Sequence, residues 1–380
     1  MNIVQLGKED YRDTIDFLNM VFSMTDEPHD FPNLLPTYYK ETQNHMNCHY
    51  AVKQEGKIKS LVGIYPCTMK IGESLLHVAR IGAVSTHPYS QKQGLMRSLL
   101  SYCVNKVKQE YDLAVLGGLR HRYLHFGFEK CGTEYIYKIN QHNLRYYQPS
   151  APLSSTIYVE KYKEVTAALL TLHNSSHLHV QRDLTNFFDI CRSWNHKPYI
   201  FYDKNEVCGY LVADKNMTHI YEFNVKEDYE GDIIYSFMNQ YQLEEVSIHI
   251  NPFNSQVTKL LTTIAEDVQI ENTANWQLFQ WEKVLQALLT AKLSKHRLLE
   301  GEIVLHIHNY NTIKIIVKNQ TASCHQTDEK PNISLDSATA MKVLFGPTSP
   351  DSIIEIPCHI THCLQSWCPL PLYMGTQDFA

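Results

Sequence analysis

The alternation of apolar and polar positions predicts a chain that mixes strands and helices. Residues 49–53 and 58–65 fit two strands around a Glu55-Gly56 turn. Residues 76–86 predict a further strand, and residues 93–110 predict a helix with one apolar face. The apolar run DLAVLGG that follows predicts a strand covered on both faces. The first part of the chain is therefore expected to be α/β, with a strand, a loop, a helix and a strand at its centre.

The remaining sequence predicts two more units. A Pro- and Ser-containing stretch at residues 146–155 is typical of a linker. Helical and strand-like runs then alternate in a second segment. The third segment predicts a hairpin, followed by a helix over residues 335–346. We expect three domains, over residues 1–148, 149–285 and 286–380.

Composition narrows the function classes. Of the 380 residues, 44% are hydrophobic and 19% are charged, so the chain should bury a sizeable core. Lys and Arg total 34 against 40 Asp and Glu, a net charge of −6, with no long basic block. A nucleic acid or an anionic membrane is therefore not expected as the main partner, because both recruit dense positive charge.

Targeting signals and metal motifs are not expected. The apolar runs fall short of the roughly 18 residues that a membrane span needs, and the N-terminal segment lacks the pattern of a signal peptide. Ten scattered cysteines then predict reduced thiols and a cytoplasmic protein. Cys358, Cys363 and Cys368 form the densest set, but no pair has Cys-x-x-Cys spacing, so we predict buried thiols and no metal site.

The stretch THPYSQKQGLMRSLL, residues 86–100, raises the question of what it binds. A loop between a strand and a helix start presents unpaired backbone N–H groups, which favour anions. Gly94 would let a ligand approach the backbone closely. The loop is neither a Walker A loop nor a Rossmann fingerprint. Taken alone, a glycine at such a turn also fits a purely structural role.

With its surroundings, this stretch resembles the acetyl-CoA loop of the GNAT acetyltransferases, Arg/Gln-x-x-Gly-x-Gly/Ala after a strand. Gln91 and Gly94 match the pattern, whereas Met96 departs from the small residue at its last position. The resemblance implies that the loop binds the pyrophosphate and that the preceding strand pairs with the pantetheine. The cofactor-binding residues that it implies are Val84, Ser85, Thr86, Gln91, Lys92, Gln93, Gly94, Leu95 and Met96.

A second motif follows about thirty residues later, in RYLHFGFEKCG. Tyr123, Gly127 and Phe128 match the Tyr-x-x-x-Gly-Phe motif that many GNAT enzymes carry. By resemblance, Tyr123 protonates the departing CoA thiolate. A thiolate with a pKa near 8.5 leaves more readily when a hydroxyl donates a proton to it.

The whole layout resembles acetyltransferases of the enhanced intracellular survival (Eis) type. This resemblance implies two tandem GNAT-like mixed-sheet domains, the second without a cofactor loop, followed by a sterol-carrier-like α+β domain. The expected fold class is thus α/β (α+β). The resemblance also implies a homo-oligomer, trimer or hexamer, and a terminal carboxylate, here of Ala380, that accepts the proton of the attacking amine. Phe379 lies beside it on the substrate side.

We predict the substrate-binding side from an acidic loop and nearby aromatic residues. Asp26 and Glu27 would attract a cationic amine, although a solvated turn with a helix cap explains the same residues. Phe22, Tyr38 and Tyr39 fit a cleft lining, although aromatic residues at such spacing more often belong to a hydrophobic core.

These observations predict an acetyl-CoA-dependent N-acetyltransferase. The acceptor would be a polyamine, an aminoglycoside or a lysine-like amine, and attack would be direct. The alternative is a non-enzymatic acyl-CoA sensor, or a lipid carrier that uses the C-terminal domain.

Overall fold

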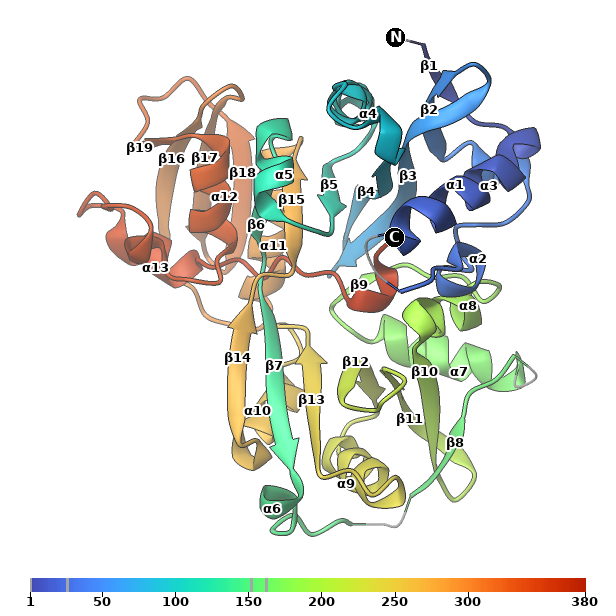
Figure 1. Cartoon of the computed structure of the whole chain (residues 1–380). Coiled ribbons are helices and arrows are strands. Elements are labelled where there is room, and N and C mark those ends of the chain that lie inside the picture. Colours follow the sequence, from blue (N-terminus) through green and yellow to red (C-terminus); the bar gives the residue numbers. More distant parts are fainter. Residues whose placement is uncertain (1, 25–26, 151–152, 161–162) are drawn as a thin grey trace.

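The computed structural model describes residues 2–24, 27–150, 153–160 and 163–380. Its strands form three sheets, of eight, seven and four strands, and helices pack around them (Figure 1). The expected α/β class with a further α+β unit is confirmed.

The first sheet is mixed, and two helices sandwich it. The apolar face of α4 (Leu95–Glu110) packs on one side, while α1 (Tyr11–Ser23) packs on the other. In order, the strands are β1 (Ile3–Gln5), β2 (His49–Gln54), β3 (Lys57–Ile71), β4 (Ser74–Thr86), β5 (Leu113–Leu116), β15 (Ala274–Leu278) and β6 (Glu129–Cys131), with β9 (Leu178–Val180) paired to β3. The short helices of this region are α2 (Phe31–Leu34), α3 (Gln43–Met46) and α5 (Arg120–Tyr123), whereas α6 (Gln141–Leu144) follows β7 and packs on the second sheet.

The second sheet repeats the central motif of the first. Its parallel strands β12 and β13 are joined through α9, as β4 and β5 are joined through α4. The strand order is β14 (Asp267–Glu271), β7 (Glu134–Asn140), β13 (Glu245–Ile250), β12 (His219–Val225), β11 (Glu206–Ala213), β10 (Lys197–Asp203) and β8 (Ser154–Ile157). The helices are α7 (Lys163–Asn174), α8 (Phe187–Cys191), α9 (Glu230–Gln240) and α10 (Ser255–Ile264). Residues 226–229, which lead into α9, contain no glycine.

The third sheet is small and shares a core with the first. Side chains of β3 and β4 belong to one hydrophobic cluster with α11 and the third sheet. The strand order is β18 (Thr321–Gln326), β17 (Thr312–Lys318), β16 (Gly301–Ile307) and β19 (Ile333–Leu335). The helices are α11 (Trp281–Leu293), α12 (Ser337–Phe345) and α13 (Thr361–Trp367). The likeness of this unit to a sterol carrier stays a prediction.

Three strands cross the domain boundaries expected from the sequence, and one of them is β9, which lies after residue 149 but pairs with β3 of the first sheet. β7 lies before residue 148 but belongs to the second sheet, and β15 lies after residue 149 but inserts between β5 and β6 of the first. The GFEKCGTEYIYKI stretch, which the pattern predicts as a single strand, is therefore two strands in different sheets. Gly132, with φ of +84°, lies at the break. The three-domain division itself stays a prediction.

None of the described helices is both long enough and apolar enough to cross a bilayer. The predicted cytoplasmic location stays a prediction.

Because strands are exchanged between the sheets, we predict that the first unit does not fold alone. Without β15, a fragment of residues 1–148 would expose one edge of β5, all four of whose residues are buried, and would lose the fully buried Trp276. We expect that fragment to show no cooperative thermal transition by circular dichroism, whereas the full chain does. A sharp transition in the fragment would contradict this dependence.

Candidate active site

The site begins where two parallel strands separate. β4 and β5 pair only from Val78–Ile81 to Leu113–Leu116. Past these pairs β4 continues to Thr86, whereas β5 ends and the chain turns through Gly117 and Gly118. In open sheets with such parallel strands, ligands bind beyond the carboxyl ends of the strands.

A bulge in β4 shapes the same place. Gly82 pairs with Gly63 and Ser85 with Leu61, so Ala83 and Val84 both oppose a single residue of β3. Ala83 has a φ of +54°, which is uncommon for a residue with a side chain. A bulge bends its strand and interrupts the regular ladder. Val84 and Ser85 are thereby directed into the space between the strands, where both line a cleft.

The loop after β4 leads into α4. Gly94 is the N-cap of α4 with a φ of +76°, and no side chain caps the helix start. A Cβ at Gly94 would meet nothing within 4 Å, so positive φ rather than crowding explains the glycine. The uncapped first turn of a 16-residue helix therefore faces the loop with its positive dipole end.

These elements enclose an open cleft of about 550 Å³. It brings together ten of the site residues predicted from the sequence: Phe22, Val84, Ser85, Thr86, Gln91, Lys92, Gly94, Leu95, Met96 and Tyr123. Gln93 does not line it, because this side chain is exposed and its Nε2 donates to the carbonyl of Tyr89 at 3.5 Å.

Tyr123 ends the short helix α5 and closes the far side of the cleft. A Cβ at Gly118 would lie 3.3 Å from its ring Cε2 and 3.7 Å from its hydroxyl, so the ring rests on the turn after β5. Burial raises the pKa of Tyr123, and neighbouring Arg122 offsets only part of that rise. The phenol therefore stays protonated at neutral pH and can act as a proton donor.

Two arginines of the cleft escaped the sequence reasoning. Arg97, in the first turn of α4, and Arg122, in α5, line the cleft from two elements. Both are exposed, and within the described chain neither has an ion pair. Both lie inside the motifs that identified the loop and Tyr123. Their convergence depends on how α4 and α5 pack, which the sequence pattern does not give.

The acidic loop contributes fewer residues to the cleft than the sequence predicts. Asp26 lies outside the described residues, and Glu27 is exposed and is not part of the cleft lining. Asp30 caps α2, since its carboxylate accepts from the backbone N–H of Asn33 at 3.4 Å. Tyr38 and Tyr39 are buried in the core, as the alternative interpretation predicts.

The last residue of the sequence reaches the first sheet. The backbone oxygen of Ala380 would lie 2.7 Å from a Cβ at Gly82, so it packs directly on β4, next to the bulge. Phe379 instead packs against the core shared with the third unit, away from the cleft lining. Residue 380 thus contacts β4 at a position two residues before Val84.

A buried ion network lies behind this tail. The guanidinium of Arg182 contacts the carboxylates of Glu222 and Asp378. Burial alone would raise the pKa of Glu222, but Arg182 and His173 outweigh it and hold that pKa far below its usual range. Among the described residues, no group of three or more His, Cys, Asp or Glu is placed to hold a metal ion.

Comparison with known proteins finds one family model that matches the N-terminal part of the chain. Residues 2–131 match the family described as "Acetyltransferase (GNAT) domain". A search of curated protein sequences gives no match. The matched residues contain the loop, the β4 bulge and Tyr123.

Several solved structures share the full-length fold. A probable N-acyltransferase from Enterococcus faecalis is 16% identical with a TM-score of 0.74, over 100% of this chain and 99% of that one. A GCN5-related N-acetyltransferase from Anabaena variabilis is 15% identical with a TM-score of 0.72, over 100% of both. Eis1 from Mycobacterium abscessus is 15% identical with a TM-score of 0.64, over 100% of this chain and 99% of that one. These identities establish likeness of fold.

The lowered pKa of Glu222 predicts a pH-dependent contribution to stability. Its carboxylate stabilises the fold at pH values above the unfolded pKa of about 4.3, and this stabilisation is lost as the pH falls toward the lower folded pKa. Glu222→Gln should therefore lower the free energy of unfolding most above about pH 5, with a difference from wild type that shrinks below about pH 4. Urea denaturation of both proteins at a series of pH values measures this difference in the free energy of unfolding.

Glu206→Gln, at an exposed position of the same sheet, is the control and should show little change at any pH. A Glu222→Gln difference that stays constant with pH would count against the charged network.

Proposed function

We propose that this protein is an acetyl-CoA-dependent N-acetyltransferase that acts on a primary amine. The observation that carries the proposal is the convergence of the uncapped start of α4, the bulged end of β4 and the Tyr123 phenol on one cleft. The match of residues 2–131 to the GNAT family supports the same chemistry.

Binding of acetyl-CoA would use the cleft from end to end. Backbone N–H groups of residues 92–96, together with the side chain of Gln91, receive the pyrophosphate, and the dipole of α4 favours its negative charge. The pantetheine pairs with Val84–Thr86, which have no partner on the β5 side among the described strands. Arg97 and Arg122 add two positive charges for the phosphates.

Transfer would be a direct attack. The amine nitrogen forms a bond to the thioester carbonyl carbon, the carbon–sulfur bond breaks, and Tyr123 donates its proton to the departing sulfur. A backbone N–H near Val84 polarises the carbonyl. The carboxylate of Ala380, held at Gly82, accepts the proton that the amine loses.

The acceptor belongs to the polyamines, the aminoglycosides or lysine-like amines. The test is release of free CoA from acetyl-CoA with each of these classes, together with acetyl-CoA binding measured by calorimetry. Binding without release for any amine would favour the acyl-CoA sensor instead. The expected homo-oligomer is also a proposal, for which sedimentation analysis is the test.

Tyr123→Phe tests the proton donor. The variant keeps the ring that packs on Gly118 and removes only the hydroxyl, so kcat should fall about a hundredfold while acetyl-CoA affinity is unchanged. Steady-state kinetics and calorimetry provide the two measurements. Tyr146→Phe, at a tyrosine that is 72% exposed, should behave as wild type. Unchanged kcat in Tyr123→Phe would remove the tyrosine from the mechanism.

Arg97→Gln tests the anion-binding end. Loss of one phosphate-facing charge should weaken CoA binding about tenfold, with little effect on kcat at saturating acetyl-CoA. Lys108→Gln makes the same charge change in the last turn of α4 and serves as the control. Equal weakening in both variants would mean that only the overall charge matters.

A further inference from the structure

The end of the chain leaves the third unit and finishes in the first. The segment after α13 passes close to the second sheet, and the C-terminus lies beside α1 and β4 (Figure 1). Such a crossing needs anchors, because a short tail whose secondary structure is a single 3-10 turn, Thr376–Asp378, is otherwise free to move. The described contacts show where those anchors are.

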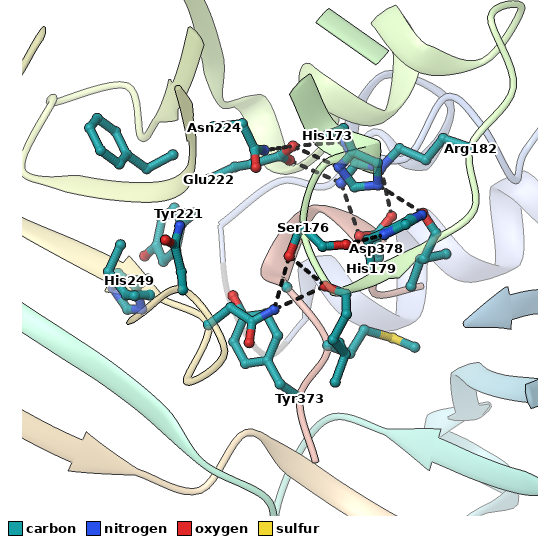
Figure 2. Close-up of a pocket in the computed structure, with 18 residues that line it drawn as sticks. His173, Ser176, His179, Arg182, Tyr221, Glu222, Asn224, His249, Tyr373 and Asp378 are labelled. Atoms are coloured by element: carbon teal, nitrogen blue, oxygen red, sulfur yellow. Dashed lines mark hydrogen bonds and ion pairs between the residues drawn. The ribbon is translucent and has the colours of Figure 1, made fainter. Parts of the chain in front are cut away.

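Asp378 carries the central anchor. Nε and Nη2 of Arg182 donate to its two carboxylate oxygens, each at 2.9 Å, and the Arg182 side chain is only 2% exposed (Figure 2). The same guanidinium donates to both oxygens of Glu222, also at 2.9 Å. One buried cation thus joins the tail to β12 of the second sheet. Paired geometry of this kind fixes orientation as well as distance.

The other two residues of this network, Arg182 and Glu222, are themselves held by further contacts. Glu222 also accepts from the Tyr210 hydroxyl and from the Asn224 amide. Arg182 lies two residues after Val180, the last residue of β9, which pairs with Met69 of the first sheet, and the N–H of the intervening Gln181 donates to the carbonyl of Thr68 at 2.8 Å. The backbone of Arg182 is therefore fixed to the first sheet, and its side chain is fixed to the second. Asp378 enters a binding position that both sheets define.

Two further contacts hold the same residues of the tail. Nη1 of Arg80 donates to the backbone carbonyl of Asp378 at 2.9 Å. The side-chain amide of Gln377 donates to the carbonyls of Ile190 and Cys191, each at 3.0 Å. Only Phe379 separates Asp378 from Ala380. Residue 380 can therefore lie no more than about 7 Å from the anchored position.

We propose that Arg182 is a positioning residue that holds the tail so that residue 380 lies against Gly82 and completes the amine side of the active site. This inference rests on the proposed acetyl transfer. Arg182 contacts neither the cleft nor the reacting atoms, and it acts only through Asp378. Its loss would leave two carboxylates facing each other without their shared cation, and Asp378 would move away, because Glu222 is held in strand β12 whereas Asp378 lies outside the sheets.

The experiment compares Arg182→Met with wild type by two independent measurements. Hydrogen exchange of peptides covering residues 373–380 reports the tail, because the N–H groups of Asp378 and Phe379 donate to Gly375 and Thr376 within a turn of the tail, and docking buries Asp378 away from water. Steady-state kinetics measures kcat and KM at the proposed active site. We expect faster exchange in the tail and a kcat at least about tenfold lower, with unchanged KM for acetyl-CoA. Arg182→Lys, which retains one charge, should restore part of both.

Arg192→Met is the matched control, since Arg192 pairs with Asp189 in the same region and does not touch the tail. Gly82→Ala is a second route that leaves the ion network intact. Its new Cβ would lie 2.7 Å from the oxygen of Ala380 and 3.2 Å from the Tyr65 ring, so the shortest clash is with residue 380. We expect a lower kcat with exchange at Asp378 unchanged and acetyl-CoA binding retained. This variant also keeps the test decisive if Arg182→Met does not fold.

Tail exchange that stays slow in Arg182→Met would overturn the proposal, and so would a released tail with wild-type kcat. Wild-type kcat in Gly82→Ala would overturn the link between residue 380 and turnover. If the wild type shows no CoA release with any amine, the proposed function has failed. The exchange comparison then still decides whether Arg182 holds the tail.

Discussion

The insertion of β15 beside β5 is the constraint on which the rest of the structure depends. β5 is four residues long and fully buried, and it needs a partner along each edge. On one side β4 pairs with it and then diverges, and on the other side β15 returns from beyond residue 270 to complete the sheet. Because the strand that supports the cleft comes from late in the chain, the cleft requires the second unit to be in place.

The same exchange explains why the units form one framework. β7 leaves the first region to join the second sheet, β9 returns to β3, and the core around α11 includes side chains from β3 and β4. Each crossing buries apolar surface that no single unit could cover. A short tail that passes between these sheets therefore meets walls that are already fixed relative to one another.

Charge is distributed unevenly around this framework. The cleft contains the exposed side chains of Arg97 and Arg122, whose charges water solvates. The tail instead supplies one of the two carboxylates, that of Asp378, which flank the buried cation of Arg182. Their pairing must be complete because an unpaired charge is costly away from water. The first arrangement suits a ligand that comes and goes. The second suits a part of the chain that must stay in place.

The local pattern was sufficient for the parts of the site that are continuous in sequence. Strand 76–86, the loop through Gly94 and helix 93–110 are adjacent along the chain, so periodicity and turn chemistry predicted them, whereas Tyr123 was implied by the resemblance of its surroundings to a motif of GNAT enzymes. Alternation also predicted the hairpin of the third unit. These features depend on interactions between near neighbours, which the sequence contains in full.

Tertiary structure alone decided the rest. No periodicity shows that residues 127–139 divide between two sheets, that β15 inserts beside β5, or that Arg97 and Arg122 face one cleft. The pairing of Arg182 with Asp378 joins residues 196 positions apart, and neither has a local signature. Sequence determined the elements because their hydrogen bonds are local. The structure decided their partners because burial of shared surface depends on the whole chain at once.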